Sequence, residues 1–111
     1  MIVVYTLDHS EQKTPFGRRV HIEQRFFQGG RYYWGLDDND GDREIMFKSS
    51  APADFMLMGD SDHFMITTAD GRSGVQPGGP HNGLGVGDLG NATQFQLLDE
   101  LSCSSRYHLA R

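Results

Sequence analysis

Apolar and polar residues alternate along three neighbouring segments between residues 20 and 47, a pattern that predicts β-strands. The apolar faces consist of Val20, Ile22 and Phe26 in the first segment, Tyr32, Trp34 and Leu36 in the second, and Ile45 and Phe47 in the third. A shift of one residue in the pairing would move a whole face to the other side of the sheet. The two intervening turns must therefore align the three faces in one antiparallel meander.

The first turn contains Gln28, Gly29 and Gly30. We expect these residues to form a three-residue hairpin loop, with Gly30 in the positive-φ conformation that such a loop requires. The expected cross-strand pairs are Phe26 with Tyr32, Gln24 with Trp34 and Ile22 with Leu36.

The second turn contains Asp40 and Gly41, a favoured pair for a two-residue hairpin loop. This loop predicts Leu36 opposite Ile45. It also predicts Trp34 opposite Phe47, so both turns gather the apolar side chains on one face of the sheet.

Strands are also expected on either side of the meander. Residues 2–7 form a short apolar run, which the polar residues 8–19 connect to the meander. Further along, the apolar runs 55–58 and 63–67 flank a turn. A two-residue loop at this turn predicts pairing of Phe55 with Ile66 and of Leu57 with Phe64.

A helix is the alternative for residues 50–58, because Ser50 could cap it and Gly59 could end it. Short apolar runs do not distinguish the two structures by periodicity. We favour the strand.

Residues 71–90 contain eight of the 14 glycines, together with Pro77 and Pro80. This composition disfavours both helix and strand. We therefore expect a long, mobile, glycine-rich loop, which is where a ligand site would be sought first.

The carboxy-terminal residues 92–103 fit two structures. Asn91 and Gln94 resemble a capping box, and apolar residues then recur at helical spacing, so we favour a helix of about ten residues. Alternation around Phe95 supports a strand instead, with residues 106–110 pairing back onto it.

These patterns together predict a mainly β fold, α+β with little helix. We expect an antiparallel meander sheet, curved or barrel-like, with one short C-terminal helix. The alternative is an all-β fold in which the C-terminal segment forms strands.

Length and charge limit the class of protein. Residues 1–111 suit one domain, and the single cysteine cannot form an internal disulfide, which favours a cytoplasmic protein. Fifteen acidic residues against ten Lys and Arg give a net charge of −5, so we expect no nucleic-acid partner. The apolar runs are far shorter than the ~20 residues that span a bilayer, so we expect no membrane partner.

Candidate metal and cofactor motifs are incomplete. The acids between Asp37 and Glu44 miss the calcium-loop spacing, because Leu36 would occupy the first ligand position. The five histidines show no metal-binding spacing. Residues 85–90 match the letters GxGxxG, but we expect no strand before them. We therefore expect neither a metal site nor a cofactor.

The aromatic sheet face and the glycine-rich loop exceed what a minimal fold requires. A curved aromatic surface edged by a few polar groups is typical of sites for small apolar ligands. The expected ligand-binding residues are Gln24, Phe26, Tyr32, Trp34, His81 and Asn82.

Two functions follow from these residues. The favoured one is a non-enzymatic domain that binds a small apolar ligand or another protein, with a homodimer as the expected assembly. The alternative is a small hydrolase or isomerase with the loop residue His81 as general acid or base. The sequence does not decide whether the protein is an enzyme.

Overall fold

The computed structural model describes residues 2–7, 15–26, 28–39, 42–48, 50–77, 83–100 and 106–110. Over this part of the chain it contains ten β-strands and one 3₁₀ turn. Their bounds are β1 (Ile2–Thr6), β2 (Arg19–Arg25), β3 (Arg31–Asn39), β4 (Asp42–Lys48), β5 (Phe55–Gly59), β6 (Phe64–Thr68), β7 (Ser73–Pro77), β8 (Leu84–Asp88), η1 (Leu89–Asn91), β9 (Gln96–Glu100) and β10 (Arg106–Ala110).

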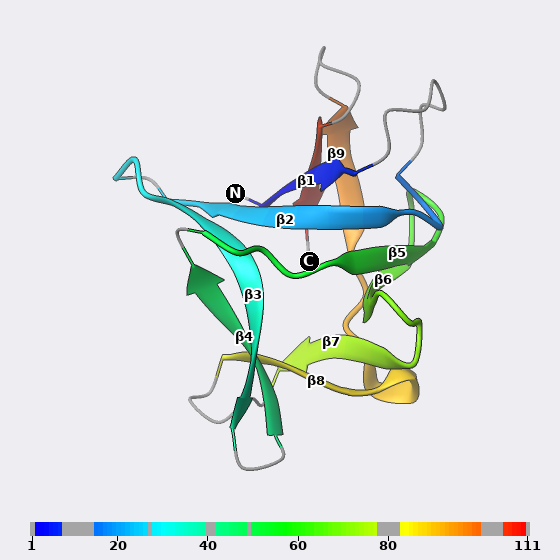
Figure 1. The fold of residues 1–111 in the computed structure, drawn as a ribbon. Helices are drawn as coiled ribbons and strands as arrows, with labels where there is room; N and C mark the ends of the chain where they lie inside the picture. Colours follow the sequence, from blue (N-terminus) through cyan, green and yellow to red (C-terminus); the bar gives the residue numbers. More distant parts are fainter. Residues whose placement is uncertain are drawn as a thin grey trace.

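The strands form a closed antiparallel barrel. Hydrogen-bonded pairing runs from β3 through β4, β8, β7, β6 and β5 to β2, and the pairing of β2 with β3 closes the ring of seven strands. β1, β10 and β9 extend the sheet from the other edge of β2 (Figure 1). The mainly β, barrel-like fold predicted from the sequence is confirmed.

β2 is the strand that closes the barrel. One edge pairs with β1, while the opposite edge pairs with β5 at its start and with β3 at its end. Val20 thus pairs with Thr6 across one edge of β2 and with Phe55 across the other. Splitting one edge between two strands lets the sheet turn back on itself without leaving that edge unpaired.

The β3–β4 hairpin has the predicted register. Trp34 pairs with Phe47, and Leu36 pairs with Ile45. Pairing continues to Asn39 and Asp42, as a two-residue turn between them requires.

The predicted register of the β2–β3 hairpin is wrong by two residues. Gln24 pairs with Tyr32 instead of Trp34. The backbone N–H of Phe26 donates to the carbonyl of Gly30 at 2.9 Å, and Gly29, at φ +88°, takes the left-handed position expected for Gly30. The closing pair of the loop therefore lies one residue earlier on each strand, which leaves the faces unchanged.

The predicted pairing of β5 with β6 is also shifted by two residues. Leu57 pairs with Ile66 instead of Phe64. The Asp60 carboxylate accepts hydrogen bonds from the backbone N–H groups of Asp62 (3.0 Å) and His63 (3.1 Å). These bonds stabilise a turn of four residues where two were expected. Residues 55–59 form a strand, as favoured over the helix.

The expected long glycine-rich loop is wrong, because β7 and β8 form a hairpin with Val75 opposite Val86. Glycine permits close approach here. A Cβ on Gly74 would lie 2.5 Å from the Cβ of Ala92, and one on Gly87 would lie 2.7 Å from the Nε2 of Gln76. Since β7 and β8 carry ladder hydrogen bonds, we expect slow amide exchange in these two strands.

The favoured C-terminal helix is also wrong, and the strand alternative is confirmed: β9 pairs with β10. Phe95 and Phe64 exchange two backbone hydrogen bonds of 2.8 and 3.1 Å. This bridge fixes Phe95 in an extended conformation, within the first turn of the expected helix. The only helical residues of the described chain belong to the 3₁₀ turn η1.

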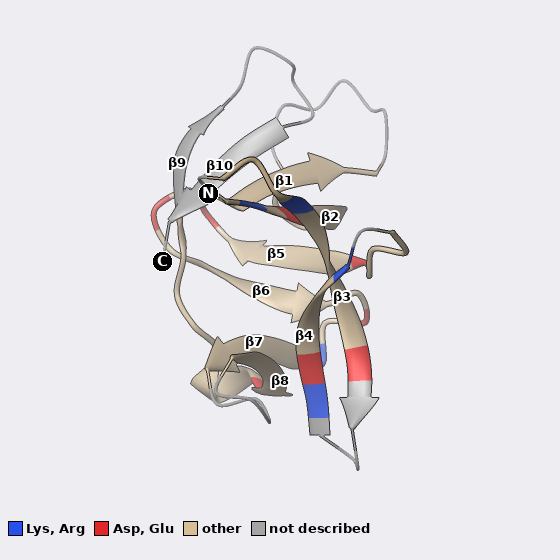
Figure 2. Ribbon diagram, turned by 90° about the vertical axis from the view of Figure 1, so that its left-hand side faces the viewer, with Lys and Arg blue, Asp and Glu red and all other residues tan. Residues whose placement is uncertain are grey.

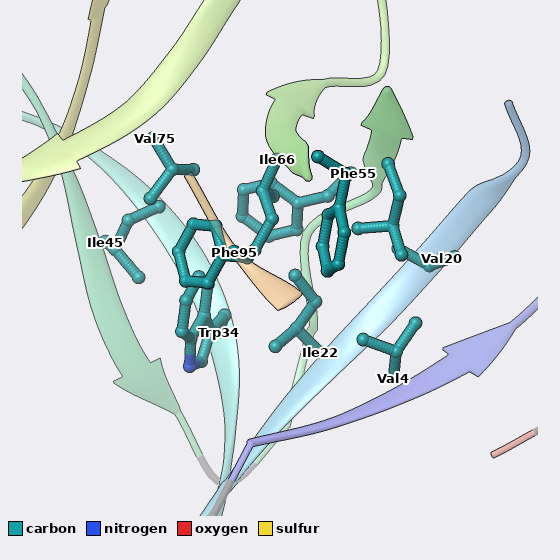
Figure 3. Packing of buried hydrophobic residues seen from close by; sticks show 11 residues of the cluster. Val4, Val20, Ile22, Trp34, Ile45, Phe55, Ile66, Val75 and Phe95 are labelled. Atoms are coloured by element: carbon teal, nitrogen blue, oxygen red, sulfur yellow. The ribbon is translucent and has the colours of Figure 1, made fainter. Parts of the chain in front are cut away.

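The core fills the interior of the barrel. The ring of Phe95 lies near the centre of the buried cluster, beside Trp34 and Ile66 (Figure 3). It stacks on Phe64 with ring centroids 6.0 Å apart, and Trp34 meets Phe55 edge-on at 6.1 Å. The inward face predicted from alternation thus supplies much of the core.

A buried carboxylate lies on the outer face of β2. Glu23 accepts hydrogen bonds from the Nε of Arg25 and from the hydroxyl of Tyr5, while Arg25 Nη2 donates to the same hydroxyl at 2.9 Å. The hydrogen bond to Glu23 raises the pKa of Arg25 above its ordinary value. The network compensates the desolvation of Glu23 and joins β1 to β2.

Candidate functional site

The inward aromatic face of β2, β3 and β4 continues past the end of the barrel. Trp34 is fully buried, but Phe26, Tyr32 and Phe47 are 44, 41 and 47% exposed. Alternation places all four side chains on the same face of the sheet. The predicted face is therefore core at one end and open surface at the other.

A hollow of about 390 Å³ lies at this open end, which we call the aromatic end of the barrel. Its volume falls within the range typical of sites for small molecules. It is lined by Ile2, Gln24, Phe26, Trp34, Phe47, Pro77, Gly83 and Leu84, which come from β1, β2, β3, β4, β7, β8 and the residues next to them.

Trp34 connects the hollow to the core. Its indole Nε1–H donates to the Oε1 of Gln24 at 3.4 Å, which satisfies the one polar group of a buried ring. Because Trp34 is enclosed and also lines the hollow, a ligand there would rest on a rigid part of the barrel.

The wall of the hollow contains an aromatic cluster. Phe26 lies edge-on to Phe47, with ring centroids 5.7 Å apart. Tyr32 also meets Phe26 edge-on, with ring centroids 6.0 Å apart, and it is not among the residues that line the hollow. Both contacts have the edge-to-face geometry that aromatic pairs prefer, so the exposed rings support one another.

Among the described residues that line this hollow, none carries a charge. Besides the indole N–H of Trp34, the amide of Gln24 is the polar side-chain group of this described lining. Since its Oε1 accepts from Trp34, its Nε2 group is the part of the amide left to donate to a ligand. The lining chemistry suits a neutral, mainly apolar molecule that offers a hydrogen-bond acceptor.

Four of the six predicted ligand-binding residues are therefore near one another: Gln24, Phe26 and Trp34 line the hollow, and Tyr32 contacts Phe26. His81 and Asn82 lie outside the described residues, so the structure does not test the predicted roles of these two residues. Pro77 and Gly83, which flank that segment in the sequence, both line the hollow.

A second group of polar residues was not predicted. His21 Nε2 lies 2.8 Å from Asp54 Oδ1, and Arg19 forms an ion pair with the same carboxylate. Asp54 is more than 30 positions from the other two residues in the sequence, and no sequence spacing connects it to them. They meet because β2 pairs with β5 at this point.

The described part of the chain contains no group of three or more His, Cys, Asp or Glu side chains placed to hold a metal ion. None of its helical segments has the length and apolar character needed to cross a membrane.

Comparisons with known proteins give no family assignment. No protein-family model, curated protein or solved structure shows significant similarity to this chain.

Proposed function

We propose that the protein is a non-enzymatic binding domain whose aromatic end takes up a small, neutral, mainly apolar ligand. The observation that carries this proposal is the hollow itself, in which Trp34 lies against the core while Phe26 and Phe47 stand exposed at the side. Large exposed rings on a concave surface are costly to hydrate, and a bound apolar molecule would remove part of that surface from water.

The polar side chain of Gln24 defines the ligand further. The Oε1 of Gln24 accepts a long hydrogen bond from the indole N–H of Trp34 at 3.4 Å, which leaves the Nε2 group of Gln24 as a donor for a ligand. A ligand with a carbonyl or ether oxygen would satisfy this donor. A charged ligand would lose its hydration without gaining an ionic partner among the described lining residues.

Self-association through the same surface is the second candidate. The observation that favours it is the exposure of three neighbouring aromatic side chains, Phe26, Tyr32 and Phe47, in the isolated chain. In a homodimer, these rings would be covered by their counterparts in the second copy. A ligand would change the Trp34 environment at any protein concentration, whereas dimerisation would change it on dilution.

The composition of the chain supports proposals about its cellular location and its class of partner. The cytoplasm is the proposed location, supported by the single cysteine. A net charge of −5 supports a partner other than nucleic acid.

The indole N–H of Trp34 reports directly on this site, because Trp34 is the only tryptophan in the chain. We expect acetophenone, a neutral ring with a carbonyl group, to shift the ¹H–¹⁵N resonance of this group in a saturable way. Benzoate has a similar size and a negative charge, and it should produce a much smaller shift. An indole resonance unmoved by acetophenone, and unmoved by dilution, would exclude both candidate functions.

Matched variants locate the effect. Phe47→Ala removes an exposed wall of the hollow and should weaken acetophenone binding. Met58→Ala shortens another exposed apolar side chain, on β5 and outside the hollow, and should leave binding unchanged. Equal loss in both variants would point to non-specific hydrophobic adsorption.

A further inference from the structure

A second hollow lies at the opposite end of β2, β3 and β4, which we call the charged end of the barrel. Its volume is about 340 Å³. It is lined by Arg19, Leu36, Arg43, Asp54, Thr68, Ala69 and Asp70. The described lining of this hollow thus contains two arginines and two aspartates, whereas the described lining of the aromatic hollow contains no charged residue. Figure 2 shows acidic and basic residues close together on β3 and β4 toward the turn that joins them.

Asp70 is held in place by the fold. Its Oδ1 accepts hydrogen bonds from the hydroxyl of Thr68 at 2.5 Å and from the backbone N–H of Arg72 at 3.0 Å. The Thr68 hydrogen bond is the main reason that the pKa of Asp70 is lowered. Thr68 is itself buried at the end of β6, so this carboxylate is fixed by a rigid part of the barrel.

Asp54 is oriented on one side and weakly paired on the other. His21 Nε2 contacts its Oδ1 at 2.8 Å, while Arg19 approaches its Oδ2 only to 3.8 Å. The Arg19 side chain is 67% exposed, and a long ion pair of this kind stabilises little in water. A ligand ammonium group can therefore take the place of Arg19 beside Asp54 with little loss of free energy. A ligand carboxylate can likewise take the place of Asp54 beside Arg19.

The balance of charges restricts the ligand class. A purely anionic ligand would be repelled by the two carboxylates, and a purely cationic ligand by the two guanidinium groups. A molecule carrying both charges would meet a partner for each. Leu36 and Ala69 supply an apolar surface for the part between the charges.

We propose that the charged hollow binds a small zwitterion, with one ammonium and one carboxylate group on a short apolar body of amino-acid or dipeptide size. Arg19 and Arg43 receive the carboxylate, because a guanidinium group can donate two parallel hydrogen bonds to it. Asp54 and Asp70 receive the ammonium group. This site is separate from the aromatic hollow, and neither proposal depends on the other.

Titration of the intact chain with L-alanyl-L-alanine tests this proposal through backbone ¹H–¹⁵N spectra. We expect saturable shifts at Thr68, Ala69 and Asp70, with the Trp34 indole resonance unmoved. The N-acetylated and the C-amidated dipeptides each lack one charge, and each should bind at least about tenfold more weakly. Absence of saturable shifts at these amides, or equal binding of the capped forms, would overturn the proposal.

Two charge-removing variants make the test specific. Arg19→Gln removes a lining guanidinium group and should weaken dipeptide binding severalfold. Arg31→Gln removes an exposed arginine at the other end of the barrel and should leave binding unchanged. The ¹H–¹⁵N spectra of both variants without ligand show whether they are folded. Weakened dipeptide binding by a folded Arg19→Gln protein would support the proposal, and unchanged binding by that variant would contradict it.

Discussion

The aromatic end and the charged end of the barrel are built on the same three strands, yet they relate differently to the core. At the aromatic end, Trp34 belongs to both the core and the hollow. At the charged end, most of the polar side chains that line the hollow are partly or fully exposed, and the apolar lining residue Leu36 is only half-buried. Substitution of the buried Trp34 should therefore change binding and stability together, whereas substitution of exposed lining residues at either end should change binding with little effect on stability.

Truncation of Trp34 is expected to have the largest effect. Trp34→Ala removes a fully buried ring that packs against Phe55, and it should lower the free energy of unfolding by about 3–5 kcal/mol. Urea denaturation followed by circular dichroism measures this loss. A decrease below about 1 kcal/mol would show that Trp34 is not part of the core and would remove the contrast between the two ends.

Truncation of Phe47 should affect binding more than stability. Its ring is nearly half exposed and contacts Phe26 edge-on, so Phe47→Ala should cost only about 0.5–1.5 kcal/mol of unfolding free energy. The same denaturation experiment, run beside the acetophenone titration, separates the two effects. A stability loss as large as that of Trp34→Ala would mean that the core extends to the rim.

The charged end should show a small effect that depends on pH. The hydrogen bond from Thr68 lowers the pKa of Asp70 in the folded protein relative to the unfolded chain. Ionised Asp70 therefore contributes stability above the ordinary carboxyl pKa, and this contribution is lost as the pH falls through the lowered pKa of the folded state. The effect is small because the group is exposed to solvent.

Asp70→Asn should accordingly make stability less dependent on pH below about pH 4, the range in which aspartates titrate. Denaturation at several acidic pH values measures this slope. Asp62→Asn, which removes an exposed carboxylate from the β5–β6 turn, is the control and should keep the slope of the parent protein. An unchanged slope in Asp70→Asn would contradict a lowered pKa.

Side-chain alternation predicted the faces of the strands more reliably than turn composition predicted their register. Gln24 and Leu57 each pair two residues away from the expected partner, and a shift of two preserves the face. The shifts arise from turn hydrogen bonds, such as those accepted by Asp60, which depend on the turn conformation.

Long-range pairing was the part of the fold that local patterns could not supply. The bridge between Phe64 and Phe95 overrides a local helix signal, and packing against Ala92 explains Gly74 in a strand. Part of the aromatic hollow could be predicted, because Gln24, Phe26 and Trp34 belong to one meander, whereas Ile2 and Leu84 reach it from other strands. The charged hollow could not, since Arg19, Asp54 and Asp70 meet only after the barrel closes.

The most direct test of the aromatic hollow is to find which protein protons lie next to a bound neutral probe. Intermolecular nuclear Overhauser effects from the ring of acetophenone should reach the side chains of Phe26, Trp34 and Phe47. None should reach Thr68 or Ala69 at the charged end. Contacts at the charged end, or a saturable complex without contacts to Trp34, would contradict the assignment of the aromatic end as the ligand site.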